Sequence, residues 1–116
     1  MSGGGRDSVY LGHLMAFDVV PILTWGYKSR ILTANDAFLD LVGYDRKELG
    51  TINWAVLTPS EYRSLDEHCL RLLADVAVAP PYVKEIVRKD GERVVVRVYT
   101  GRGAIPEEGI AVVLEL

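Results

Sequence analysis

The chain has 116 residues, of which 49% are hydrophobic and 25% are charged. This length and composition indicate one globular domain and exclude a mainly disordered chain. The net charge is −3 and the 13 Lys and Arg residues are scattered, which argues against a nucleic-acid partner. The most apolar window, 14–27, contains Asp18 and Pro21 and is too short to span a membrane. Cys69 is the single cysteine, so an internal disulfide is excluded and a reducing, cytoplasmic setting is expected.

Two N-terminal segments are predicted before the core, a tail and a helix. Residues 1–7 are Gly-rich and are expected to be a flexible tail. Residues 8–20 are predicted to form a cap helix, because apolar side chains such as Tyr10 and Leu14 recur at helical spacing. The core domain is then expected to span 21–116. The cap helix either mediates dimerisation or only covers part of the core, and the pattern favours neither.

Two short strands and a helix are predicted next. Residues 22–26 and 30–34 are rich in β-forming side chains and are separated by a short loop, which favours a hairpin. Asn35 is a good N-cap residue for a following helix, and Gly43 suits the residue after its end, where positive φ is cheap for glycine. The apolar residues of this helix recur on one face: Phe38, Leu41 and Val42.

The middle of the chain carries two further helix-start signals. Asp45 and Glu48 have the spacing of a capping box and predict a one-turn helix. Thr58-Pro59-Ser60-Glu61 predicts a longer helix that runs to about Val76, with Thr58 as its cap. Its apolar stripe is predicted to contain Tyr62, Leu65, Cys69, Leu72 and Val76.

Three strands complete the expected fold. They are predicted at 82–89, 92–100 and 110–115, with Asp90-Gly91 as the tight turn between the first two. Valines 94, 96 and 98 share one face of the middle strand. Val95 and Tyr99 lie on the other, and Val87 of the preceding strand is placed with them. The element order predicts an α+β domain, in which helices are inserted between strands two and three of a five-stranded antiparallel sheet.

Several of these residues, in this order, resemble the PAS domain family. The matching motifs are Asn35, Ala37-Phe38, Leu41, Gly43-Tyr44, Glu48-Leu49 and the hairpin Lys89-Asp90-Gly91. The resemblance covers nearly all of the folded chain. It implies a sheet that holds short helices against one face, and a role in sensing or relaying signals. It also implies that small molecules bind between the helices and the sheet, or that copies pair through the sheet's outer face.

The cofactors of this family can be compared with the residues present. The adduct-forming flavin branch has a cysteine where this chain has Asn53-Trp54-Ala55-Val56-Leu57, so a covalent flavin adduct is not expected, while non-covalent flavin stays open. Haem-binding members use a histidine that would fall near Asp66. His68 lies two residues further, about 200° around the helix, which disfavours haem. Cys69 is expected to pack as a small apolar residue, and no metal-ligand spacing is present.

A pocket lined mainly by apolar side chains is expected between helices and sheet. It predicts either a small, mostly apolar ligand or a plain core filled by the same side chains. The candidate lining residues are Phe38, Leu41, Val42, Trp54, Leu57, Leu65, Cys69, Leu72, Val94, Val96 and Val98.

No catalytic constellation is evident, so the chain is not expected to be an enzyme. Neighbouring Asp66 and Glu67 are expected to diverge around the helix. The outer sheet face is instead predicted to form a homodimer interface from Val95 and Tyr99, together with Tyr10 and Leu14 of the cap helix. The combined prediction is a cytoplasmic, bacterial-type two-component sensory module that acts on an output domain outside this chain. The alternative is a ligand-free scaffold for dimerisation or docking.

Overall fold

The computed structural model describes residue 13, residues 19–105 and residues 107–116 of the chain. The predicted tail, nearly all of the predicted cap helix, and with them Tyr10 and Leu14, lie outside the described residues. No described helix is long and apolar enough to cross a membrane.

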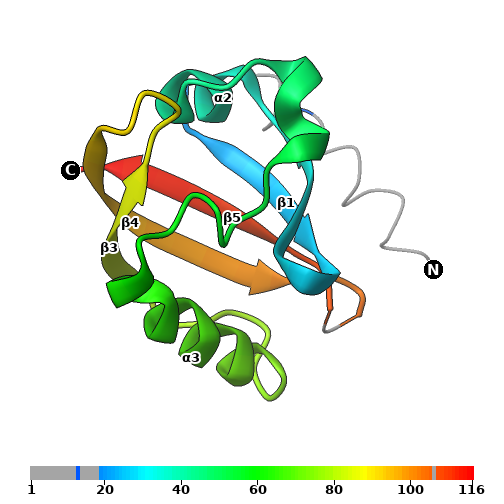
Figure 1. The fold of residues 1–116 in the computed structure, drawn as a ribbon. Coiled ribbons are helices and arrows are strands. Elements are labelled where there is room, and N and C mark those ends of the chain that lie inside the picture. Colours follow the sequence, from blue (N-terminus) through cyan, green and yellow to red (C-terminus); the bar gives the residue numbers. More distant parts are fainter. Residues whose placement is uncertain (1–12, 14–18, 106) are drawn as a thin grey trace.

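The described residues form a five-stranded antiparallel sheet in the order β2-β1-β5-β4-β3 (Figure 1). The α+β prediction is therefore confirmed, and the predicted strand ends lie within two residues of the observed ones. The last strand of the chain, β5, lies in the middle of the sheet, which explains why both of its faces are apolar. The strands are β1 (Ile22–Gly26), β2 (Arg30–Ala34), β3 (Tyr82–Val87), β4 (Arg93–Arg102) and β5 (Gly109–Glu115).

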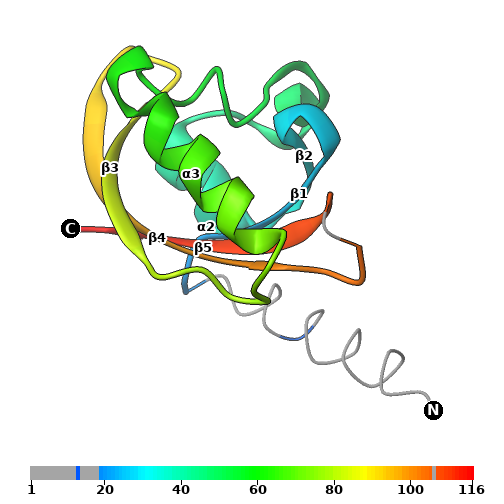
Figure 2. The ribbon, with the colours of Figure 1, turned by 90° about the horizontal axis from the view of Figure 1, so that it is seen from below.

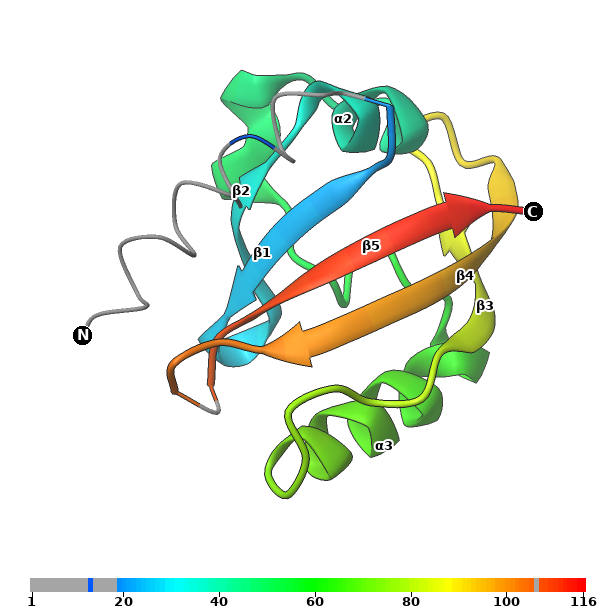
Figure 3. The same ribbon diagram turned by 180° about the vertical axis from the view of Figure 1, so that it is seen from behind.

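The helices lie on one side of this sheet. Figure 2 shows α2 (Asp36–Val42) and α3 (Arg63–Leu73) on the same side, and Figure 3 shows β1, β5 and β4 in front of them when seen from behind. Between sheet and helices lies one core, in which Phe38, Leu57, Val96 and Val113 are fully buried. Burial of these apolar side chains is the main stabilising contribution to the fold.

The predicted caps of the first helices are confirmed. The Asn35 side chain accepts a hydrogen bond from the Phe38 backbone N–H at 3.0 Å, and Gly43 follows α2 with φ +82°. Asp45 and Glu48 form the predicted capping box, here at the start of the 3-10 helix Arg46–Thr51. These helices therefore start and end where local sequence chemistry dictates.

The long helix differs from its prediction in both its start and its phase. It begins at Arg63 after a 3-10 turn, Ser60–Tyr62, and Thr58 does not cap it. It also ends at Leu73 rather than near Val76. Of the predicted stripe only Cys69 is buried: Leu65 and Val76 are 38% and 43% exposed, and Tyr62 and Leu72 are half-buried. The buried residues of α3 are Asp66, Cys69 and Leu73. The inner face is rotated because a carboxylate occupies it, held there by a partner on β3 that is described below.

The alternation along β4 is confirmed. Val94, Val96 and Val98 face the core with at most 9% exposure, whereas Val95 and Tyr99 lie on the outer face and are 44% and 38% exposed. Strand periodicity alone therefore assigned both faces of this strand.

Candidate functional site

A cavity of about 380 Å³ lies between α3 and the sheet. This volume is within the range of small-molecule pockets. Much of its wall is aromatic, with Trp25 from β1, Tyr27 from the following turn, Trp54 from the loop before α3, and Tyr82 from β3. The remaining wall includes small or apolar side chains: Leu23, Ala55, Cys69, Leu70, Val98 and Ala111.

Trp25 is fixed in the cavity wall by the strands beside it. Its indole N–H donates to the Thr100 hydroxyl at 3.0 Å, and Thr100 donates in turn to the Ile110 carbonyl at 2.9 Å. Gly109 lies opposite Trp25 in the β1–β5 pairing, and a Cβ at this position would collide with the indole ring and with the Gly101 carbonyl. The absence of a side chain at Gly109 therefore leaves room for the indole ring.

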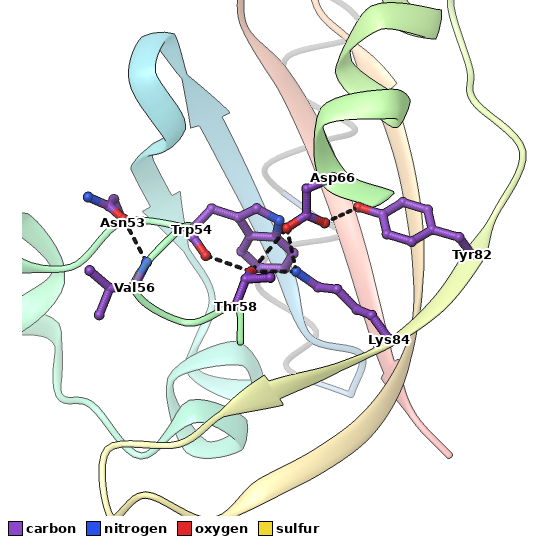
Figure 4. Close-up of polar contacts among 7 residues, drawn as sticks. All are labelled: Asn53, Trp54, Val56, Thr58, Asp66, Tyr82 and Lys84. Atoms are coloured by element: carbon purple, nitrogen blue, oxygen red, sulfur yellow. Dashed lines mark hydrogen bonds and ion pairs between the residues drawn. The ribbon is translucent and has the colours of Figure 1, made fainter. Parts of the chain in front are cut away.

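A buried ion pair joins Lys84 to Asp66, a residue of the cavity wall (Figure 4). The Lys84 Nζ donates to Asp66 Oδ2 at 2.8 Å and to the Thr58 hydroxyl at 2.6 Å. The Tyr82 hydroxyl donates to the other carboxylate oxygen, Asp66 Oδ1, at 2.6 Å. Because Tyr82 and Lys84 belong to β3 and Asp66 to α3, these contacts join the helix to the edge strand of the sheet.

The loop before α3 completes this polar group. The Thr58 hydroxyl lies 2.8 Å from the Trp54 carbonyl and 3.0 Å from Asp66 Oδ2, so its single hydrogen has two acceptors within reach. The Lys84 ammonium also lies 4.1 Å from the centre of a Trp54 ring, a favourable cation–π arrangement. Asn53 accepts from the Val56 N–H at 2.8 Å and so orders the turn that carries Trp54.

Burial perturbs the titratable groups around the pair. Desolvation lowers the pKa of Lys84 to about 8, although the Asp66 carboxylate acts in the opposite direction. Desolvation and the nearby Asp66 charge raise the pKa of the Cys69 thiol to about 11, and the same two causes raise the pKa of Tyr82. Cys69 is consequently a protonated, weakly reactive thiol at neutral pH.

Three predicted pocket residues line the cavity, namely Trp54, Cys69 and Val98. Leu65 and Leu72 of α3 are not in its wall, because the helix is rotated. The other predicted residues are buried in the core without lining the cavity: Phe38, Leu41, Val42, Leu57, Val94 and Val96.

Sequence reasoning missed Trp25, Asp66, Tyr82 and Lys84. The inward phase of β3 was the available signal for the last two residues, because alternation with the outward-placed Val87 puts both on the inner face. His68 is exposed and is not in the cavity wall. Within the described part of the chain, His, Cys, Asp and Glu side chains form no group of three that could hold a metal ion.

A model of the PAS domain family matches residues 21–114. The chain therefore belongs to this family, whose members are sensory modules of signal-transduction proteins and are generally not catalytic. The family resemblance read from the sequence is confirmed.

The related proteins agree with this assignment. Hybrid signal transduction protein dokA of Dictyostelium discoideum is 32% identical over 83 residues, which is 70% of this chain and 5% of that protein. A domain of a sensory box sensor histidine kinase/response regulator from Geobacter sulfurreducens superposes with a TM-score of 0.77 at 15% identity, covering 93% of each chain. The PAS domain of a LuxR-family transcriptional regulator from Burkholderia thailandensis, solved in complex with ethanol, gives 0.74 at 17% identity, covering 90% of this chain and 96% of that one.

Proposed function

We propose that this chain is a ligand-binding sensory module, which holds a small, mostly apolar molecule in the cavity between α3 and the sheet. The observation that carries the proposal is the cavity of about 380 Å³ with four aromatic side chains in its wall. An apolar cavity with a few convergent polar groups is the usual form of a small-molecule site. The ethanol complex of the Burkholderia thailandensis PAS domain supports it as an example of a similar fold with a small organic molecule.

A bound molecule in this cavity would contact two layers at once. Asp66, Cys69 and Leu70 belong to α3, whereas Val98 and Ala111 belong to the sheet. A ligand shifts a conformational equilibrium only through different affinity for the two states. Contacts to both α3 and the sheet provide this difference in affinity. They favour the conformation in which the distance between α3 and the sheet fits the ligand best.

The signal is proposed to pass to an output domain of the parent protein in a cytoplasmic two-component pathway. The sensor histidine kinase neighbour supports this pathway type. The relatives come from bacteria and from Dictyostelium discoideum, so the proposal specifies the pathway and not the kind of organism.

Absorption spectroscopy and native mass spectrometry of the purified protein test the proposal. We expect a co-purifying small molecule that is lost in Ala111→Ile, which places a larger side chain in the cavity wall. Ala74→Ile is the matched control, because Ala74 is exposed at the end of α3 and lies outside the wall. If both methods detect nothing, and added apolar ligands leave the thermal midpoint unchanged, the ligand-free scaffold replaces this proposal.

The outer face of the sheet supports a second proposal, pairing of two copies of the chain. Val83, Val95 and Tyr99 of β3 and β4 are 44%, 44% and 38% exposed, and the outward side chains of β5 are half-buried apolar residues. Apolar faces of this kind mark interaction surfaces. Sedimentation is expected to show a dimer at micromolar concentration that dissociates in Tyr99→Glu. A monomer throughout this range contradicts the proposal.

A further inference from the structure

The buried ion pair presents only one of its two partners to the cavity. The Asp66 side chain is 12% exposed and lines the cavity, whereas the Lys84 side chain is 0% exposed and does not. A molecule in the cavity can therefore reach the carboxylate but not the ammonium.

The Asp66 carboxylate retains acceptor capacity for such a molecule. An ionised carboxylate offers about four lone-pair positions. Tyr82 and Lys84 each occupy one, and the Thr58 hydroxyl occupies a third when its hydrogen points to Asp66 rather than to the Trp54 carbonyl. At least one position remains for a hydrogen-bond donor, and a donor to an ionised acceptor makes a stronger bond than one to a neutral acceptor.

The local charge favours a neutral donor. Lys84 already balances the Asp66 carboxylate at 2.8 Å, so a second buried ammonium would lack a counter-charge of its own. A ligand carboxylate would meet the Asp66 oxygens and be repelled. The other charged residues of the wall lie in exposed positions and are available to solvent: Lys28, Arg63, Glu67 and Glu107. A neutral hydroxyl group loses less solvation than an ammonium or a carboxylate does when it reaches the Asp66 carboxylate.

We propose that Asp66 accepts a hydrogen bond from the hydroxyl group of a small neutral alcohol or phenol, whose apolar body lies against the aromatic wall of the cavity. Tyr82 and Lys84 act as positioning residues, because each holds one carboxylate oxygen. This inference rests on the proposed ligand-binding function and names the ligand class for it.

Four probes of similar shape test the ligand class: 4-methylphenol, toluene, 4-methylbenzoate and benzylamine. Their dissociation constants are measured by NMR titration of the whole chain. The wild-type protein is expected to bind 4-methylphenol about tenfold or more tightly than toluene, the size of effect that a hydrogen bond to a charged group provides. The two charged probes are expected to bind more weakly than 4-methylphenol.

Asp66→Leu/Lys84→Met removes both charges together, so no unpaired ion is left in the core. In this variant we expect 4-methylphenol to lose its advantage while toluene still binds. Asp75→Asn is the matched control, because it neutralises an exposed carboxylate just after α3 that lies outside the cavity wall, and it should preserve the preference.

Equal binding of toluene and 4-methylphenol to the wild type overturns the inference and leaves the proposed function standing. A preference that survives in the double variant, or disappears in Asp75→Asn, also overturns it. Binding of none of the four probes overturns the proposed function together with the inference.

Discussion

Replacing Asp66 by leucine removes the carboxylate that faces the Lys84 ammonium. The Lys84 side chain has no solvent exposure, and its remaining contacts are the Thr58 hydroxyl at 2.6 Å and the Trp54 ring at 4.1 Å. Neither contact carries a compensating charge. The folded variant must therefore either hold an unpaired ammonium or release its proton.

The size of the loss follows from these two alternatives. Removing one member of a buried ion pair typically destabilises a protein by about 3–5 kcal/mol. Release of the Lys84 proton limits the charge part of the loss here: from a folded wild-type pKa of about 8, deprotonation at pH 7 costs about 1.4 kcal/mol. The lost hydrogen bonds of the Asp66 carboxylate add about 1 kcal/mol or more. We therefore expect Asp66→Leu to cost about 2–3 kcal/mol at pH 7. The double variant Asp66→Leu/Lys84→Met should regain most of this, because two apolar side chains of similar size replace the pair.

The loss should also depend on pH with a definite sign. Burial lowers the pKa of Lys84 to about 8 in the folded wild type, and the unfolded chain keeps this proton up to about 10.5. Stability contributed by this group therefore rises with pH between these values. Without Asp66 the folded-state pKa falls further, so the rise starts at lower pH and the gap to the wild type narrows from pH 7 to 9.5.

Urea unfolding followed by tryptophan fluorescence measures these free energies at both pH values. The double variant is the control that separates loss of charge pairing from loss of packing. A cost below about 1 kcal/mol for Asp66→Leu, or a double variant as unstable as Asp66→Leu itself, would refute the reasoning. A gap that widens toward pH 9.5 would refute the assigned role of Lys84.

Three further substitutions or reactions test the structure. Gly109→Ala should destabilise the fold by about 2 kcal/mol or more in thermal unfolding, because the added Cβ meets the Trp25 ring and the Gly101 carbonyl. Gly50→Ala should be nearly neutral, because the space around Gly50 is open. Asn35→Ala should cost about 2–4 kcal/mol in urea unfolding, because the buried side chain accepts from the Ile22 and Phe38 N–H groups; a loss under 1 kcal/mol would contradict this role. Cys69 should react with iodoacetamide at pH 7.5 at least about tenfold more slowly in the folded chain than in the urea-unfolded chain, because burial raises the pKa of its thiol to about 11. Equal rates would contradict the burial of this thiol.

The fold was largely predictable because its signals are local. The Asn35 cap, the Gly43 stop and the Asp45–Glu48 box each depend on residues three or four positions apart, and each is present in the structure. Strand faces followed from alternation in the same way, as Val94 and Val95 illustrate. Chemistry confined to a few consecutive residues acts similarly in any tertiary context, which makes such elements readable from sequence.

The cavity was less predictable because its wall depends on contacts between distant segments. Trp25 lies in the wall only because Gly109 and Thr100, more than seventy residues further along, leave room for its ring and accept its N–H. Nothing in the residues next to Trp25 distinguishes a wall residue from a core residue. The predicted lining was therefore a set of core side chains, of which few reach the open space.

The phase of α3 was wrong for a different reason, since the prediction treated a carboxylate as a surface group. Hydrophobicity alone favours a stripe through Leu65 and Leu72, and it places Asp66 outside. The alternation of β3, however, puts Lys84 on the inner face, and a buried ammonium requires an anionic partner. The helix that packs on the sheet offers two carboxylates, Asp66 and Glu67. Pairing Asp66 with Lys84 turns the helix to its observed phase. In this domain the inward-facing lysine, read before the apolar stripe, predicts that one of these carboxylates turns toward the sheet and joins the polar group of the cavity.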